Sequence, residues 1–254
     1  MGQHCRIAAA AIGYALPPTR LEVDSEMIFM YWTGTDVGTP PAAAAWRNLY
    51  SDFRVFTDEA VVPLLPDAIR PIYGRIRLPS AKSDLARLLL LREFGGLYID
   101  AHVGPTSPAD LVGTLDKMFE YDMILFGKGW LMTDPHHFDL MNGVLAARRH
   151  ARALDVLVSR ITSNIVEQWR KEKNTAGYEP YDLFSLSGTY TIVQSYFEQI
   201  SPRPQIKDEF KNSIFVHFMK DNKRSGFEIA AYYNYRKPGG HWSERQTRER
   251  YFLD

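Results

Sequence analysis

Residues 82–103 read KSDLARLLLLREFGGLYIDAHV, and this stretch decides the fold. Its leucines cover most of the circumference of an expected helix over residues 81–94, which predicts a helix buried on more than one side. A Gly-Gly pair ends that helix, and an apolar strand then leads directly to Asp100. A buried helix followed at once by a buried strand is typical of layered α/β proteins.

The rest of the chain repeats this alternation of apolar strands and helices. The pattern predicts one α/β domain, a sheet flanked by helices, over residues 27–254, preceded by an N-terminal extension over residues 1–26. The expected strands are residues 27–33, 54–57, 97–103, 123–127 and 214–219. The expected helices are residues 42–53, 81–94, 153–170 and 184–198.

Composition limits the function classes. Lysine plus arginine number 30 and aspartate plus glutamate number 30, so the chain lacks the basic surplus of a general nucleic-acid binder. The single cysteine, Cys5, has no partner for an internal disulfide. The apolar run Ile7–Leu16 has only a thin basic region before it, which argues against a signal peptide, and no stretch reaches the roughly 20 apolar residues of a transmembrane helix. We therefore expect a soluble, cytoplasmic protein without a transmembrane segment.

Two charges continue the buried stripe of the helix over residues 81–94. Asp84 and Arg87 share a face with Leu88 and Leu91, because residues three and four apart are neighbours on a helix. Buried charges need partners, since unpaired burial is expensive. Two interpretations follow: the pair satisfies itself, or both side chains point into a cleft and hold a polar ligand.

The end of the following strand is the expected position of a ligand. In α/β sheets, ligands bind beyond the carboxyl ends of the strands, where this sequence places Asp100. Asp100 and His102 lie on the same side of an extended chain, because side chains alternate along a strand. A carboxylate and an imidazole in that arrangement can hold a divalent metal ion.

These residues, in this order, resemble the signature of the bacterial and fungal glycosyltransferases with a DxD sugar-binding region. The resemblance extends to the capsular polysaccharide synthesis proteins and, more distantly, to the large clostridial glucosylating toxins. The residues that carry it are Ser83, Asp84, Arg87, Phe94, Gly95, Gly96, Tyr98 and Asp100. Weaker matches lie at Trp32 after the first strand, Asn142, Ser187–Thr189 and His217 at the end of a late strand.

The resemblance implies a fold, an activity and a set of contacts. The fold is GT-A-like, with a Rossmann-type nucleotide-binding sheet. The activity is transfer of a hexose from a UDP- or GDP-sugar to a hydroxyl acceptor such as a glycan or polysaccharide precursor, with retention of configuration. The catalytic positions it implies are Arg87, Asp100 and Asn142. The positions it implies for donor binding are Trp32, Thr33, Ser83, Asp84, Arg87, Asp100, Ser187, Gly188 and Lys220.

The chain departs from the family pattern at the metal site. His102 stands where the second acidic residue of DxD is expected. We predict a Mn²⁺ (or Mg²⁺) site formed by Asp100, His102 and His217, with manganese favoured because imidazole suits it better than magnesium. The alternative is that the metal site is weakened or lost, and that Lys220 or Arg224 stabilises the leaving group instead.

Other interpretations stay open at this point. With His102 breaking the acidic pair, the chain can be a nucleotide-sugar-binding pseudoenzyme. His136, His137 and Asp139 suggest a metal-dependent hydrolase, although the HExxH spacing is missing. His241 and Trp242, after two glycines, can either close over the donor or pack as an ordinary aromatic pair. The sequence decides neither the sugar, the base nor the acceptor.

Overall fold

The structure is a computed structural model, and it describes residues 27–33, 38–127, 140–198, 205–219, 225–229 and 239–253. Several expected features lie outside the described residues. They are the extension over residues 1–26, the His136, His137 and Asp139 cluster, and the basic residues Lys220 and Arg224.

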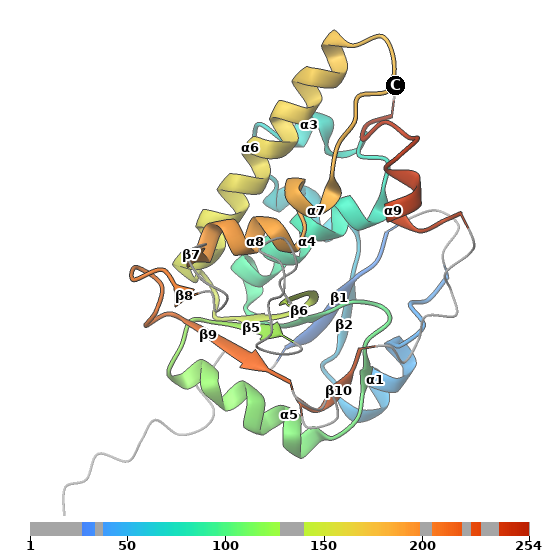
Figure 1. Ribbon diagram of the computed structural model, residues 1–254. Helices are drawn as coiled ribbons and strands as arrows, with labels where there is room; N and C mark the ends of the chain where they lie inside the picture. The colour runs from blue at the N-terminus through green and yellow to red at the C-terminus, as the bar shows by residue number, and fades with distance from the viewer. Residues whose placement is uncertain are drawn as a thin grey trace, which may run out of the picture.

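A six-stranded mixed sheet forms the centre of the molecule, in the order β2-β1-β3-β6-β5-β9 (Figure 1). Strand β6 is antiparallel to both of its neighbours, and the other pairs in the sheet are parallel. The strands are β1 (Ile28–Tyr31), β2 (Arg54–Phe56), β3 (Gly96–Ile99), β5 (Met123–Gly127), β6 (Leu140–Ala147) and β9 (Ile214–Phe218). This confirms the predicted α/β domain with a sheet flanked by helices.

Helices cover both faces of the sheet. Successive strand residues point to opposite sides, and both sets are apolar here, so both faces are buried under helices. Phe29 and Tyr31 face one core with Tyr98, whereas Ile28 and Met30 face the other. Helices α4 (Pro79–Phe94), α6 (Arg152–Asn174), α7 (Leu183–Leu186) and α8 (Thr189–Tyr196) lie on the first side in Figure 1. Helices α1 (Ala43–Leu49) and α5 (Pro108–Leu115) lie on the second.

Shorter elements complete the described structure. The short helices are α2 (Asp58–Val61), η1 (Val62–Leu64), α3 (Arg70–Tyr73), η2 (Asp116–Phe119) and α9 (Trp242–Arg245). The two-residue strands pair as β10 (Phe227–Glu228) with β4 (Gly104–Pro105), and β7 (Phe197–Glu198) with β8 (Gln205–Ile206). Among the described residues, no helix combines the length and apolarity needed to cross a membrane.

The Gly-Gly pair ends α4 as predicted and also sets the start of β3. Gly95 and Gly96 have φ angles of 70° and 98°, a backbone conformation that residues with a side chain rarely adopt. A Cβ atom at Gly96 would in addition collide with the carbonyl oxygen of Met27, next to β1. The two glycines therefore let the chain turn sharply from the buried helix into the neighbouring strand.

The structure differs from the expected elements in several places. Strand β3 ends at Ile99 rather than at residue 103, so Asp100 and His102 follow the strand and do not alternate along it. Helix α1 ends at Leu49 rather than at residue 53.

The single helix expected over residues 184–198 is divided into α7 and α8, because Gly188 adopts an extended conformation and becomes the N-cap of α8. Strand β6 was not expected at all. Its first half is interrupted by Asn142 and Gly143, which hide the apolar pattern of a buried strand.

Candidate functional site

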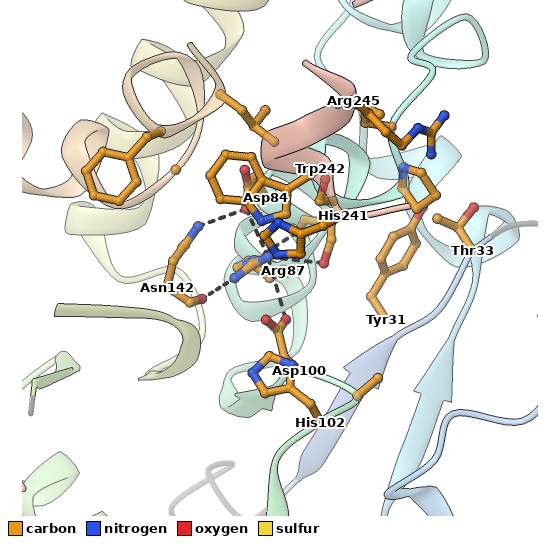
Figure 2. Close-up of a pocket in the computed structure, with 18 of the residues that line it drawn as sticks. Tyr31, Thr33, Asp84, Arg87, Asp100, His102, Asn142, His241, Trp242 and Arg245 are labelled. Atoms are coloured by element: carbon orange, nitrogen blue, oxygen red, sulfur yellow. Dashed lines mark hydrogen bonds and ion pairs between the residues drawn. The ribbon is translucent and has the colours of Figure 1, made fainter. Parts of the chain in front are cut away.

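A cavity of about 540 Å³ lies beyond the carboxyl ends of β1 and β3 and beside the first turns of α4. This is the position at which open α/β sheets bind ligands. The lining residues come from segments far apart in the sequence (Figure 2): Tyr31, Trp32, Thr33, Leu78, Pro79, Ser80, Ser83, Asp84, Arg87, Asp100, Ala101, His102, Asn142, Leu183, Phe184, Gly188, Thr189, Gly240, His241, Trp242 and Arg245.

Asp84 is a buried carboxylate whose two oxygens are both bonded. Its Oδ1 accepts a hydrogen bond from Asn142 Nδ2 at 2.8 Å and pairs with Arg87 Nη2 at 2.9 Å. Its Oδ2 accepts a hydrogen bond from Ser187 Oγ at 2.7 Å. Burial raises the pKa of Asp84 to about 6, although Arg87 and the two hydrogen bonds act in the opposite direction.

Arg87 connects the elements around Asp84. Its Nε donates to the carbonyl oxygen of Ser83 at 3.0 Å, its Nη2 donates to Ser83 Oγ at 3.1 Å, and its Nη1 donates to the carbonyl oxygen of Asn142. Its Nη2 also lies 3.6 Å from Asp100 Oδ1. Burial alone lowers the pKa of Arg87, but Tyr98, Asp100 and Asp84 together raise it above its ordinary value.

The structure shows that the Asp84–Arg87 pair satisfies itself, and that both residues also border the cavity (Figure 2). That they hold a polar ligand stays a prediction. Their bonds tie helix α4 to strand β6 through Asn142, and to the end of β3 through Asp100. The pair is thus a rigid part of the cavity wall, with its polar atoms already oriented.

Asp100 is held at the end of β3 by its neighbours. Its Oδ1 accepts a hydrogen bond from the Tyr98 hydroxyl at 2.6 Å, and its backbone N–H donates to the Gly143 carbonyl at 2.8 Å. The Tyr98 hydroxyl lies 2.9 Å from Ser83 Oγ. A Cβ atom built on Gly143 would lie 2.7 Å from Asp100 Oδ2, so the missing side chain leaves room for the carboxylate.

Sequence reasoning missed Gly143, although a glycine within a strand often marks a close approach. Replacing Gly143 with alanine should displace the Asp100 carboxylate, because the added methyl group would also lie 3.1 Å from its Cγ. We expect turnover of any substrate that uses Asp100 to fall by roughly tenfold or more, by analogy with misplaced catalytic groups. The backbone of Gly143 is not in the left-handed region, so the fold should remain.

A matched control separates this clash from the general effect of losing a glycine. Nothing lies within 4 Å of a Cβ built on Gly113, which is in helix α5. Gly113→Ala should keep wild-type turnover and gain slightly in thermal stability, since alanine favours helix. Steady-state kinetics and thermal melting of both variants provide the check. Equal turnover in Gly143→Ala and Gly113→Ala would mean that Asp100 does not need its present position.

The structure brings His102 to the cavity but not His217. His102 is 9% exposed and lines the cavity with Asp100. His217 lies in strand β9 opposite Phe126, is not among the lining residues, and has its Nε2 3.1 Å from Ser225 Oγ. Burial lowers its pKa. Among the described residues, no group of three or more His, Cys, Asp or Glu side chains is placed to hold a metal ion.

The other end of the cavity is formed by the exit of β1. The indole Nε1 of Trp32 donates to the Gly38 carbonyl at 2.6 Å, which fixes the ring plane. Thr33 Oγ1 donates to Asp58 Oδ2 at 3.1 Å, and the Tyr31 hydroxyl donates to Asp58 Oδ1. Lys82 Nζ pairs with Asp58 Oδ2 at 2.9 Å. Asp58 thus orients two lining residues, and only its position after the second strand gave a signal in the sequence.

At Asp58, unlike Asp84, hydrogen bonds and a nearby charge outweigh burial in setting the pKa. Burial raises the pKa of this carboxyl, but hydrogen bonds from Tyr31 and Lys82 and the Lys82 charge bring it below its ordinary value. The carboxylate therefore stays ionised and keeps Tyr31 and Thr33 in place against the cavity.

The remaining walls come from the α7–α8 junction and from α9. Ser187 is buried and does not line the cavity itself, but its hydroxyl is bonded to Asp84, whereas Gly188 does line the cavity. His241 and Trp242 both line the cavity, and Trp242 also packs against the hydrophobic core. The two interpretations of His241 and Trp242 are therefore compatible, because Trp242 packs on the core and borders the cavity as well.

Comparisons with known proteins give a family match and a likeness to solved structures. Residues 42–119 match the family model described as "Glycosyltransferase sugar-binding region containing DXD motif". No curated protein matches the chain. The solved structure titled "PaToxG Glycosyltransferase" is similar with a TM-score of 0.41 and 14% sequence identity, and the match covers 67% of this chain and 68% of that chain.

The family match confirms the predicted resemblance and the predicted class of enzyme, a glycosyltransferase. The matched residues contain Asp84, Arg87 and Asp100, and therefore the part of the cavity wall in which the three side chains contact one another. The match does not extend to Asn142, His217 or the C-terminal wall.

Proposed function

We propose that this chain binds a nucleotide-sugar in the cavity and transfers its hexose to a hydroxyl acceptor. The observation that carries the proposal is the bonded set of Asp84, Arg87 and Asp100, which lines a cavity at the carboxyl ends of parallel strands. The same three residues lie within the segment that matches a glycosyltransferase sugar-binding region. A volume of about 540 Å³ is within the usual range for small-molecule sites.

The donor has two distinct environments available to it. Trp32 and Thr33, at the end of β1, are proposed to contact the base, because an indole face offers stacking. Ser83, Asp84 and Arg87, on α4, are proposed to contact the ribose and the hexose. Gly188 and its neighbours at the start of α8 close the same cavity. Lys220, outside the described residues, is proposed as a further contact to the diphosphate.

The polar groups around Arg87 are oriented in advance, but Asp84 and Asp100 leave the set with a net negative charge. We therefore propose that Lys220, or a divalent ion at Asp100, would supply the positive charge that a departing diphosphate needs. Arg87 is the cation between the two carboxylates Asp84 and Asp100, and Asn142 bonds to both Asp84 and Arg87. A site organised in advance can stabilise developing charge without reorganising during the reaction. We assign Arg87, Asp100 and Asn142 to catalysis on this basis. The described cavity offers no obvious covalent nucleophile, and we propose transfer on the same face, with retention of configuration.

The residues present fit a divalent ion in part. Gly143 leaves room for the Asp100 carboxylate, and His102 lines the same cavity, so these two side chains would hold Mn²⁺ or Mg²⁺. His217 fits less well, because it lies outside the cavity lining. When bound, such an ion would neutralise charge on the leaving nucleoside diphosphate. Asp100 already shares its Oδ1 with Tyr98 and Arg87, which orient it.

Trp32 provides a test of the base contact. Trp32→Ala should weaken nucleotide binding by about 1–3 kcal/mol, or roughly 5-fold to 150-fold in Kd, which is the usual contribution of a stacked base. Calorimetry with UDP and GDP measures the difference. Trp32→Phe, which keeps an aromatic face at the same position, is the matched control and should lose much less affinity. Unchanged nucleotide affinity in folded Trp32→Ala would contradict the assignment.

A panel of UDP- and GDP-sugars, with and without manganese, tests the function itself. Release of nucleotide from one sugar-nucleotide, faster with manganese, is the expected result. Binding without turnover of any donor would favour the pseudoenzyme that His102 suggests. Neither binding nor turnover would contradict the proposal. We propose a glycan or polysaccharide precursor as the acceptor, and the panel is also run with such an acceptor. We propose the cytoplasm as the place of the reaction.

A further inference from the structure

A second buried carboxylate lies outside the cavity, near the C-terminal end of α6. The side chain of Glu172 is 1% exposed. Its Oε1 accepts hydrogen bonds from the backbone N–H of Tyr251 at 2.7 Å and from Gln168 Nε2 at 3.1 Å. Its Oε2 accepts a hydrogen bond from the backbone N–H of Phe252 at 3.2 Å. Burying a carboxylate is expensive unless such bonds compensate it, so Glu172 forms a strong anchor for this backbone.

The anchor joins three segments of the chain. Arg250 Nη2 donates to the carbonyl oxygen of Glu172 at 2.7 Å, and Arg250 Nε lies 3.5 Å from its carboxylate. Backbone hydrogen bonds of 2.9 and 2.7 Å connect residues 251–253 to residues 75–77. Glu172 therefore fixes the C-terminal segment against α6, and the backbone bonds of residues 251–253 fix the same segment against the chain that leads into α4.

Both segments continue directly to the cavity. Residues 78–80, which follow the first segment, line it at the start of α4. The C-terminal segment begins with α9, which precedes the anchored residues 250–252, and Trp242 and Arg245 of α9 also line the cavity (Figures 1 and 2). Between α9 and the anchor, Gln246 Oε1 accepts a hydrogen bond from the Leu183 N–H at 2.9 Å. The C-terminal segment is thus fastened along its length.

We propose that Glu172 is a positioning residue for the donor cavity. It does not line the cavity, and it acts through residues 241–252, which hold Trp242 and Arg245 in the cavity wall. This inference rests on the proposed function, because it assigns Glu172 a role in binding the nucleotide-sugar. Tyr251 and Phe252 also bury their aromatic rings in the core, so Glu172 adds a polar anchor to an apolar one.

Glu172→Gln tests the anchor with almost no change in shape. The amide replaces one acceptor oxygen by an NH₂ group, which cannot accept from the backbone N–H that it faces. We expect the Kd for UDP or GDP, whichever the wild type binds, to rise by roughly tenfold, the scale of one lost hydrogen bond to a charged group. Hydrogen exchange at Tyr251 and Phe252 should accelerate. Glu167→Gln, on the same helix with a side chain 65% exposed, should leave both measurements unchanged.

A double-mutant cycle distinguishes positioning from general loss of stability. If Glu172 acts through the C-terminal segment, Glu172→Gln should weaken nucleotide binding much less in a Trp242→Ala background than in the wild type. If Glu172→Gln does not fold, Gln246→Ala releases the same segment at its middle and should show the same coupling to Trp242. Wild-type affinity in folded Glu172→Gln, or fully additive effects, would overturn the inference.

The outcomes also separate this inference from the proposed function. A wild-type protein that binds neither UDP nor GDP contradicts the proposed function. In that case the exchange rates of the Tyr251 and Phe252 amides still show whether Glu172 holds the segment. Exchange as slow in Glu172→Gln as in the wild type would refute the anchor itself.

Discussion

Arg87→Ala is expected to abolish sugar transfer and to destabilise the domain. The variant removes the guanidinium that pairs with Asp84 and lies beside Asp100, and leaves the buried Asp84 carboxylate without its cation. Breaking a buried pair in this way typically costs about 3–5 kcal/mol of folding free energy. We expect Tm to fall by roughly 6–20 °C for a domain of this size, and turnover to fall by at least about 100-fold.

Two further variants make this result specific. Arg92→Ala is the matched control on the same helix, because Arg92 lies 3.7 Å from Asp155 with both side chains partly exposed. It should keep turnover and most of its stability. Arg87→Lys keeps the charge but loses the fork that reaches Ser83, Asp84 and the Asn142 carbonyl together, so it should fold better than Arg87→Ala yet remain poorly active. Full activity in either Arg87 variant would make this network purely structural.

Asp100→Asn should stop turnover while preserving the fold. The amide oxygen can still accept from the Tyr98 hydroxyl, and the Asp100 side chain is 25% exposed, so little stability should be lost. The negative charge beside Arg87 disappears, and with it the carboxylate proposed to hold a divalent ion. We expect kcat to fall by about 100-fold or more, the scale on which single electrostatic groups act in catalysis.

The comparison for Asp100 is again a surface residue of the same type. Asp155→Asn changes a side chain that is 61% exposed, and should leave kcat and KM unchanged. Steady-state kinetics with a manganese titration measure all three proteins, and thermal melting confirms that they are folded. Asp100→Asn with wild-type kcat and manganese response would remove Asp100 from the catalytic set.

Local pattern was sufficient to predict the centre of the fold. The leucine-rich helix, the Gly-Gly stop and the apolar strand to Asp100 each have a strong local signal, and they appear as α4, the turn at Gly95 and Gly96, and β3. Asp84 and Arg87 could be placed on a buried face for the same reason. The structure adds that their polar atoms are bonded to each other and face the cavity as well.

The parts that the sequence did not predict depend on contacts between distant segments. Strand β6 became visible only through its antiparallel pairing with β3, because Asn142 and Gly143 break its apolar pattern. The roles of Asp58 and Glu172 could not be predicted locally, because decisive partners are distant in the sequence. Lys82 is 24 residues from Asp58, and Tyr251 is 79 residues from Glu172. His217 was assigned only by resemblance, outside the residues that match the family model, and its strand lies at the edge of the described sheet, outside the cavity lining.

A crystal structure with bound nucleoside diphosphate and manganese tests the central claim most directly. The account predicts that UDP or GDP lies in the cavity, with its base against Trp32 and its diphosphate towards Asp100 and Arg87. Anomalous scattering should place manganese beside Asp100, with His102 near it. A nucleotide bound elsewhere on the molecule, with this cavity empty at saturating concentration, would contradict the account.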